Sequence, residues 1–319
     1  MTASVESPAT ERVAQTRVPD FFVVGHHKSG TTALYEMLRR HPQIFMPALK
    51  EPRFFASDLR ALVTSSELLP DTLEEYLALF AQAGPDQRAG EASPSYLRSE
   101  TAAREIAELQ PAARCIAILR EPASFVRSLQ LQLLQEHVET ETDLSTAVAN
   151  EEIVRDGRQV RRYSDHIHYV EQLRRYHEAF SPEQVLVLIY DDFRSDNEAT
   201  VRRVLRFLEV DDTAPIEVLD ANPTVSVRSV RLDGALRAFY GERSPLVRAL
   251  KRPLRALTSK RMRSAALQAV RRRVAYGAPE PPDEQALLEL RRRYAAEVIA
   301  LSEYLDRDLV ALWGYDELG

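Results

Sequence analysis

The chain has little of several features that would narrow its fold class. Only one of its 319 residues is a cysteine, so no disulfide can form within the chain. Cys115 lies in an apolar run, and we expect it to be a small buried side chain. No apolar run approaches the ~20 residues that span a bilayer, and the first residues lack the apolar core of a signal peptide. We therefore expect a cytoplasmic protein.

The composition that is present is that of a globular protein, with 45% hydrophobic and 28% charged residues and a net charge of -6. Residues 1–17 are polar and rich in Pro, Thr and Ser, and we expect them to form a disordered tail. Residues 18–319 have the length of one α/β domain with a helical extension.

Three nearly all-apolar runs predict strands that are covered on both faces, at 21–25, 114–119 and 185–190. A weaker strand is predicted at 88–92, just before the segment Ser93-Pro94-Ser95. Helical patterns separate or follow them, at 31–40, 72–82, 99–109, 123–137, 164–179, 196–209 and 283–307. Asp191 and Asp192 are expected to cap the helix that begins near Ser195. The alternation predicts an α/β fold, a P-loop-like parallel sheet flanked by helices, with ligands at the carboxyl ends of the strands.

Residues 228–273 differ in character, because fourteen Lys or Arg residues stand there against two acidic ones. Leu and Ala recur between the basic residues, so we expect helices with a basic face. One interpretation is a solvated helix surface. The other is a lid or acceptor-binding element that attracts an anionic ligand or makes peripheral contact with a membrane.

The segment Gly25-His-His-Lys-Ser-Gly-Thr-Thr32 follows the first predicted strand and opens a helix. Its glycines and Thr32 match the P-loop pattern G-x-x-x-x-G-K-[ST], but Thr31 stands where that pattern has lysine. A lysine occurs earlier, at Lys28. The segment predicts a phosphate site at a helix N-terminus, without the lysine that meets a γ-phosphate. The alternative for Lys28 is a solvated loop charge.

A second anion site is predicted after the strand at 114–119. Arg120 ends this strand, Pro122 suits the first turn of a helix, and Ser128 lies eight residues after Arg120. An arginine fork and a hydroxyl can grip one phosphate together. The alternative is a surface ion pair of Arg120.

Two phosphate sites without a γ-phosphate lysine resemble the sulfotransferase family, which uses 3'-phosphoadenosine 5'-phosphosulfate (PAPS). Residues 28–32 resemble its 5'-phosphosulfate loop, and Arg120 with Ser128 resembles its 3'-phosphate pair. Residues 50–55 (KEPRFF) and 91–96 (EASPSY) are similar to the K-E-P-x-F-F and E-K-[ST]-P-x-Y elements of the bacterial and heparan-sulfate-type branch. Residues 222–229 resemble a later segment that closes over the nucleotide.

The resemblance implies PAPS as sulfate donor and no metal ion. It implies these cofactor-binding residues: His27, Lys28, Ser29, Gly30, Thr31, Thr32, Arg120, Ser128 and Arg228. It also implies that Lys28 stabilises the leaving phosphate and that Glu51 is the general base. Apolar neighbours of Glu51 would raise its basicity by partial desolvation. The alternatives are a simple Lys50–Glu51 surface pair, and a histidine base such as His27 or His137.

The resemblance implies a small-molecule, glycan or lipid acceptor with a hydroxyl group, and no nucleic-acid partner. Lys50, Arg53, Glu91 and Ser93 are the predicted acceptor-binding residues. Arg53 and Ala92 depart from the histidine and lysine often found in this branch, and the scarcity of cysteine argues against a Golgi heparan enzyme. Two rivals stay open: a P-loop kinase or nucleotide hydrolase, and a non-catalytic module that binds a nucleotide or a membrane surface.

Overall fold

The computed structural model describes residues 17–62, 69–136, 138–150, 152–155, 158–218, 226–227, 276–277 and 283–318. Residues 1–16 of the predicted tail lie outside these ranges. So do the basic segment 228–273, with Arg228, and His137.

The centre of the fold is a five-stranded parallel sheet with the strand order β2-β3-β1-β4-β7. The strands are β1 (Phe21–Gly25), β2 (Ile44–Phe45), β3 (Arg88–Ala92), β4 (Arg114–Leu119) and β7 (Val185–Ile189). The four predicted strands and their parallel arrangement are confirmed. The edge strand β2 was not predicted, because two residues are too few to carry a pattern.

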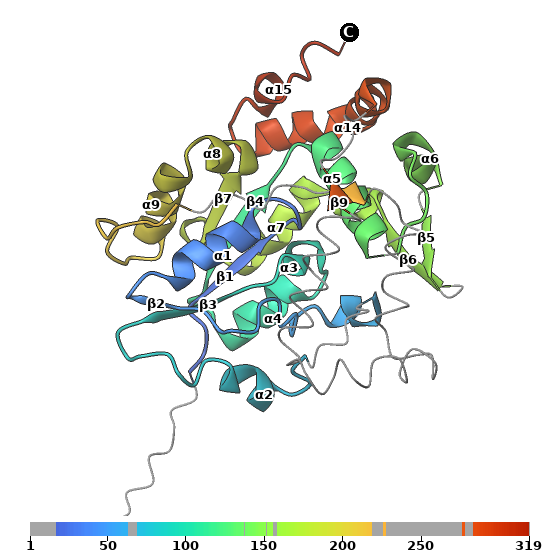
Figure 1. Cartoon of the computed structure of the whole chain (residues 1–319). Helices are drawn as coiled ribbons and strands as arrows, with labels where there is room; N and C mark the ends of the chain where they lie inside the picture. The colour runs from blue at the N-terminus through green and yellow to red at the C-terminus, as the bar shows by residue number, and fades with distance from the viewer. Residues whose placement is uncertain are drawn as a thin grey trace, which may run out of the picture.

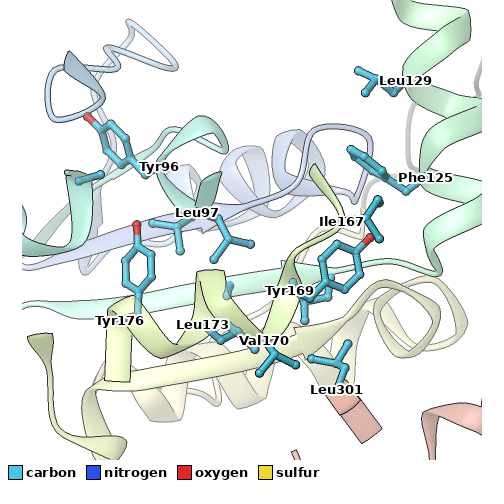
Figure 2. Close-up of a cluster of buried hydrophobic side chains, with 14 of the residues drawn as sticks. Tyr96, Leu97, Phe125, Leu129, Ile167, Tyr169, Val170, Leu173, Tyr176 and Leu301 are labelled. Atoms are coloured by element: carbon cyan, nitrogen blue, oxygen red, sulfur yellow. The ribbon is translucent and has the colours of Figure 1, made fainter. Parts of the chain in front are cut away.

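Helices cover both faces of the sheet (Figure 1). Successive strand residues point to opposite faces, so Phe21 and Val23 enter one apolar cluster and Phe22 and Val24 enter the other. The first cluster holds α1 (Thr31–Arg39) and α9 (Asn197–Phe207). The second holds α4 (Ala102–Leu109), α5 (Pro122–Gln135), α7 (Tyr169–Ala179) and α14 (Glu284–Tyr304). Figure 2 shows side chains of α7 packing in the second cluster with side chains of α5 and α14.

Long predicted helices agree with the structure to within a few residues, except that 164–179 divides into η2 (Ser164–His166) and α7. Several short elements were not predicted: α3 (Ser95–Arg98), α6 (Leu144–Ala149), α8 (Tyr190–Ser195), and the hairpin of β5 (Glu152–Arg155) and β6 (Arg158–Arg162). Helices this short depend on tertiary packing, so their own sequence carries little signal. The remaining elements are η1 (Ser57–Leu62), α2 (Leu73–Ala78), η3 (Pro182–Gln184), β8 (Ser226–Val227), β9 (Tyr276–Gly277) and α15 (Leu309–Leu312).

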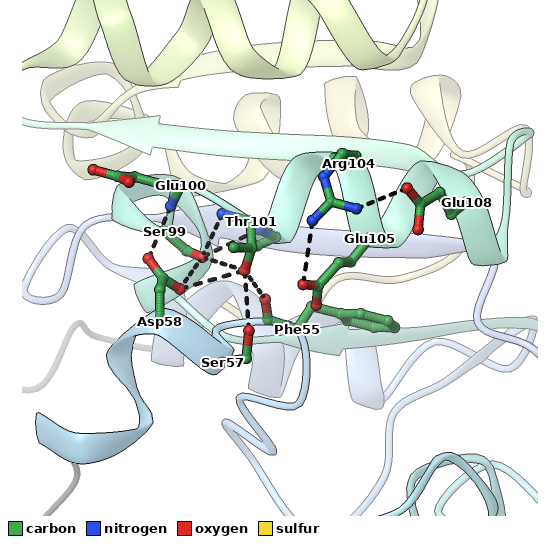
Figure 3. Close-up of polar contacts among 10 residues, drawn as sticks. Phe55, Ser57, Asp58, Ser99, Glu100, Thr101, Arg104, Glu105 and Glu108 are labelled. Atoms are coloured by element: carbon green, nitrogen blue, oxygen red, sulfur yellow. Dashed lines mark hydrogen bonds and ion pairs between the residues drawn. The ribbon is translucent and has the colours of Figure 1, made fainter.

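The loop that follows residues 50–55 is tied to the junction of α3 and α4 (Figure 3). Ser99 Oγ donates to Asp58 Oδ1 at 2.6 Å, and Thr101 Oγ1 donates to the Phe55 carbonyl at 3.0 Å. These bonds fix the segment at the carboxyl end of β3, beside the end of β1. No helix in the described part of the chain has the length and apolar character to cross a membrane.

Candidate functional site

The loop between β1 and α1 is shaped to hold an anion. Gly30 has φ 85°, and a Cβ there would lie 2.8 Å from the ring of Phe193, so glycine is required at this position. Lys28 also adopts a left-handed conformation, with φ 63°. Among the residues that the structure describes, no side chain caps the N-terminus of α1, so the first N–H groups of the helix and the positive end of its dipole face the loop.

Lys28 and Arg120 bring two positive charges together at the carboxyl ends of β1 and β4. Arg120 Nη1 donates to the Lys28 carbonyl at 2.9 Å, and its guanidinium lies 4.8 Å from the ring centroid of Tyr190. Burial and the charge of Arg120 lower the pKa of Lys28, and burial also lowers the pKa of Arg120. Two crowded, partly buried cations of this kind favour an anionic ligand.

Two buried serine hydroxyls accompany these cations. Ser29 is fully buried and Ser128 is 3% exposed, and neither Oγ has a hydrogen-bond partner in the described part of the chain. Buried hydroxyls are nearly always paired, so these two are suited to a ligand. Thr31 is buried and Thr32 is exposed at the start of α1. The residues present therefore fit a nucleotide with two separated phosphate groups.

Helix α8 connects the two predicted phosphate sites, and sequence reasoning missed it. A Cβ on Gly30 would lie 2.8 Å from the Phe193 ring and 3.3 Å from the Tyr190 ring, and Tyr190 also lies against Arg120. The sequence carries one signal for this helix, the aromatic residues Tyr190 and Phe193 just after a strand. It does not show that their rings point toward Gly30 and Arg120.

The predicted capping role of Asp191 and Asp192 is wrong, because both lie inside α8. Asp196 caps the next helix instead, accepting from Ala199 N at 2.9 Å. The Asp192 carboxylate accepts hydrogen bonds from Nη1 and Nη2 of Arg307, at 2.6 and 2.7 Å. The Asp191 carboxylate accepts a hydrogen bond from Trp313 Nε1 at 2.9 Å.

The C-terminal segment also reaches the strand end that carries Arg120. Tyr315 Oη donates to Glu121 Oε1 at 2.6 Å, and the same carboxylate caps α5 by accepting from the N–H groups of Ala123 and Ser124. Figure 1 shows α15 close to α14 and on the side of the sheet where α8 lies.

Glu51 lies in a turn with unusual backbone geometry. Glu51 has φ 61° and Arg53 has φ 54°, which places both in the left-handed region. Lys50 Nζ donates to Glu51 Oε1 at 2.7 Å, and Arg53 Nη2 donates to Oε2. The Lys50–Glu51 pair weighed as an alternative therefore forms, although both side chains are only 18% exposed.

The electrostatic environment of Glu51 differs from the predicted one. Burial raises the pKa of Glu51, but the nearby charges of His27, Lys50 and Arg53 together hold it well below its usual range. The expected gain in basicity from apolar neighbours is therefore wrong for this geometry, because the charge interactions around Glu51 outweigh its desolvation.

Glu91 and Ser93 have no exposed surface. Glu91 accepts hydrogen bonds from Tyr76 Oη and Tyr96 Oη at 2.8 Å each and from Ser93 Oγ at 2.7 Å. The prediction that Glu91 and Ser93 contact the acceptor is wrong for this structure, because both side chains are fully buried. Of the four predicted acceptor-binding residues, only Lys50 and Arg53 are partly exposed, beside Glu51.

The two histidines before Lys28 have different surroundings. His26 packs between Phe125 and Tyr169 and its Nε2 lies 3.0 Å from Gln172 Oε1. Burial lowers the pKa of His26 to about 4, so it is neutral at physiological pH. His27 is half-buried and close enough to influence Glu51. Within the described ranges, no three His, Cys, Asp or Glu side chains are grouped so that they could hold a metal ion.

Comparison with known proteins agrees with this geometry. Residues 19–214 match the profile described as "Sulfotransferase family". Mouse heparan sulfate glucosamine 3-O-sulfotransferase 6 is 30% identical over 118 residues, which cover 37% of this chain and 31% of that protein. Human carbohydrate sulfotransferase 15 is 38% identical over 65 residues, 20% of this chain and 12% of that protein. The chain thus spans less than a third of the length of these curated relatives.

A solved sulfotransferase from Alicyclobacillus acidocaldarius has the same fold, with a TM-score of 0.64 and 23% identity over 92% of this chain and 98% of that one. The family profile covers more than half of the chain, including the phosphate loop, the Glu51 turn and the Arg120–Ser128 pair. The chain belongs to the sulfotransferase family.

Proposed function

We propose that this chain transfers a sulfuryl group from PAPS to a hydroxyl group of a sugar, lipid or natural product. One observation carries the proposal. Two crowded cations, Lys28 and Arg120, lie at neighbouring strand ends, and the sequence pairs each with a buried serine hydroxyl that lacks a partner among the described residues. A nucleotide phosphorylated at two separate positions supplies an anion to each pair.

The binding roles follow from the position of each group. N–H groups at the start of α1, with the hydroxyls of Ser29, Thr31 and Thr32, hold the 5'-phosphate. Arg120 and Ser128 hold the 3'-phosphate, where the arginine fork matches two phosphate oxygens. His27 and Arg228 remain predicted cofactor contacts.

Bound PAPS supplies an activated sulfuryl group on its 5'-phosphate. Lys28 stabilises the negative charge that develops on the bridging oxygen as this group departs. Glu51 accepts the proton of the attacking hydroxyl, and its low pKa keeps it ionised at neutral pH. Its basicity rises if Lys50 or Arg53 turns from the carboxylate toward a bound anion, because either movement removes a positive charge from Glu51.

The test is calorimetric titration with 3'-phosphoadenosine 5'-phosphate (PAP), the spent donor, with ADP as the comparison ligand. We expect PAP to bind at least about tenfold more tightly than ADP, since a charge-assisted contact typically contributes more than 1.4 kcal/mol. Arg120→Ala and Ser128→Ala should remove this preference. Arg104→Gln is the matched control, because Arg104 pairs with Glu108 on the exposed face of α4 (Figure 3). Equal binding of PAP and ADP by the wild type would refute the two-phosphate site.

Two further assays on the same purified protein distinguish sulfuryl transfer from the rival functions. Turnover of ATP that requires magnesium and Lys28 would identify a kinase or hydrolase, although Thr31 in place of the usual lysine opposes this. Binding of anionic vesicles without turnover, weakened by salt, would identify a membrane-surface module. If PAP binds, a screen of sugar, lipid and phenol acceptors with labelled PAPS identifies the acceptor class.

A further inference from the structure

Glu91 is a fully buried carboxylate that neither the cofactor nor an acceptor can reach. Burying an ionised carboxylate costs stability unless hydrogen bonds compensate for the lost water. Three hydroxyls do so, and they come from three places: Tyr76 in α2, Tyr96 in α3 and Ser93 after β3. Such a group needs a reason to be present, because an apolar residue would stabilise the core at lower cost.

The directions of these hydrogen bonds supply the reason. An ionised carboxylate can only accept, so each hydroxyl gives its single hydrogen to Glu91 and keeps its lone pairs. Ser93 Oγ then accepts from Arg53 N at 3.2 Å, and Tyr96 Oη accepts from Phe55 N at 3.4 Å. Both N–H groups belong to the segment that carries Glu51.

The Glu51 segment has a third attachment at the same place. The N–H of Glu51 donates to the carbonyl of Ala92 at 3.2 Å, next to Glu91 in the sequence. Glu51 and Arg53 both have positive φ, which is costly for residues other than glycine, so the segment requires such attachments to keep its shape.

We propose that Glu91 is a positioning residue for Glu51, acting as an acceptor-only carboxylate that directs the hydroxyls of Ser93 and Tyr96 to hold the Glu51–Phe55 segment. Its importance for sulfuryl transfer rests on the role proposed for Glu51. When Glu91 loses its charge, at least one of these hydroxyls no longer points its hydrogen at the carboxylate. The hydrogen bond that this hydroxyl accepts from the N–H of Arg53 or Phe55 is then weaker.

The charge of Glu91 depends on pH within an accessible range. Burial raises its pKa to about 7, against the effect of its three hydrogen bonds, and the charge of Glu51 adds to the rise. The titratable groups that act on it from other elements are Glu51, Tyr76, Tyr96 and Tyr176. Nearby positive charges hold the pKa of Glu51 well below this window, and burial raises the pKa values of the three tyrosines well above their usual range. In this window Glu91 is therefore the group of the network that titrates.

As pH rises, the contribution of Glu91 to stability and its hold on the Glu51–Phe55 segment change in opposite directions. A carboxyl whose folded pKa is raised contributes stability below its unfolded value of 4.5, and this is lost as pH rises through about 7. The segment, in contrast, is held best above pH 7, when Glu91 is ionised. A purely structural role predicts that both change in the same direction.

The experiment measures amide hydrogen exchange of Arg53 and Phe55 by NMR on the full chain, between pH 6 and 8.5. After correction for intrinsic exchange, wild-type protection should rise about tenfold across pH 7, in proportion to ionised Glu91. Ser93→Ala should lower Arg53 protection about tenfold at pH 8, and Tyr96→Phe should lower Phe55 protection. Glu91→Gln should remove the pH dependence without lowering the melting temperature at pH 8.

Tyr76→Phe is the matched control. Like Tyr96→Phe it removes one buried hydroxyl that donates to Glu91 Oε1 at 2.8 Å, but no N–H of the Glu51 segment bonds to it. It should lower the melting temperature and leave Arg53 and Phe55 protected. Equal loss of protection in Tyr76→Phe, or wild-type protection that does not vary with pH, would overturn the proposal.

Failure of the proposed function would be separately visible. Hydrogen exchange needs neither donor nor acceptor, whereas weak PAP binding in the calorimetric test would count against sulfuryl transfer alone. Once an acceptor is identified, Ser93→Ala should lower kcat about tenfold with an unchanged Kd for PAP, because the base moves while the phosphate sites stay intact.

Discussion

The contact between the C-terminal segment and α8 leads to a prediction about cofactor affinity. Trp313 is 5% exposed and donates to Asp191, and Arg307 forms a fork on Asp192. Asp191 directly follows Tyr190, whose ring lies against the guanidinium of Arg120. The perturbation is Trp313→Phe, which keeps most of the buried ring area and removes the donor.

The expected loss of stability is about 1.5 kcal/mol, the lower end for a hydrogen bond to a charged group, because Asp191 is partly exposed. The neighbouring Arg307–Asp192 ion pair, which this substitution leaves in place, contributes only about 0.5 kcal/mol to the same contact. Its side chains are 34% and 41% exposed, so solvent screens the pair. For a chain of 319 residues, a loss of 1.5 kcal/mol lowers the melting temperature by about 2 °C.

The functional effect comes through Tyr190. If α8 shifts and Arg120 loses its contact with the ring, about 1 kcal/mol of support disappears, which raises the Kd for PAP about fivefold. Calorimetry and a thermal melt on the same sample measure both quantities. Arg206→Gln is the control, because Arg206 pairs with Asp212 on the exposed surface of α9. A lower melting temperature with an unchanged Kd would refute the coupling and leave the C-terminal contact with a role in stability alone.

Three further predictions concern the site itself. Lys28→Met should reduce turnover of labelled PAPS about 100- to 1000-fold, measured with the acceptor that the screen identifies; a loss below tenfold would contradict a transition-state role. Gly30→Ala should cost about 1–3 kcal/mol in a denaturant melt and weaken PAP binding, because φ 85° and the Phe193 ring leave no room for a methyl group, so wild-type stability would refute this conformation. Arg53→Gln should raise the pKa of Glu51 in a carboxyl NMR titration. A carboxyl group whose pKa is lowered in the folded state contributes stability above pH 4.5, and this stability is lost as pH falls. The variant should therefore lose more stability at about pH 7 than at about pH 3. Equal losses at the two pH values would contradict the Arg53–Glu51 ion pair.

The sequence predicted most of what depends on local pattern. The strands at 21–25 and 114–119 have the predicted bounds, because runs buried on both faces are nearly all apolar. The weaker prediction at 88–92 also has the observed bounds, although this strand contains Arg88 and Glu91. The sequence also placed the loop at 25–32 and Arg120 at strand ends that meet at one edge of the parallel sheet, whereas their phosphate-binding roles stay predictions.

Tertiary structure decided the environment of each charged group. The sequence places Glu51 beside apolar residues, which suggests a raised pKa, but folding brings His27 to it and turns Lys50 and Arg53 onto it. The sequence offers Glu91 as an acceptor contact, but folding surrounds it with three hydroxyls from separate elements.

The contacts of α8 were equally inaccessible from sequence, because Asp191 and Asp192 meet partners more than a hundred residues away. Periodicity and turn chemistry act over a few residues, so the chain by itself determines the strands, the long helices and the glycine-bearing loop between β1 and α1. Burial and Coulomb interactions depend on distance in space, and only the folded chain brings these charges close enough to shift one another's pKa.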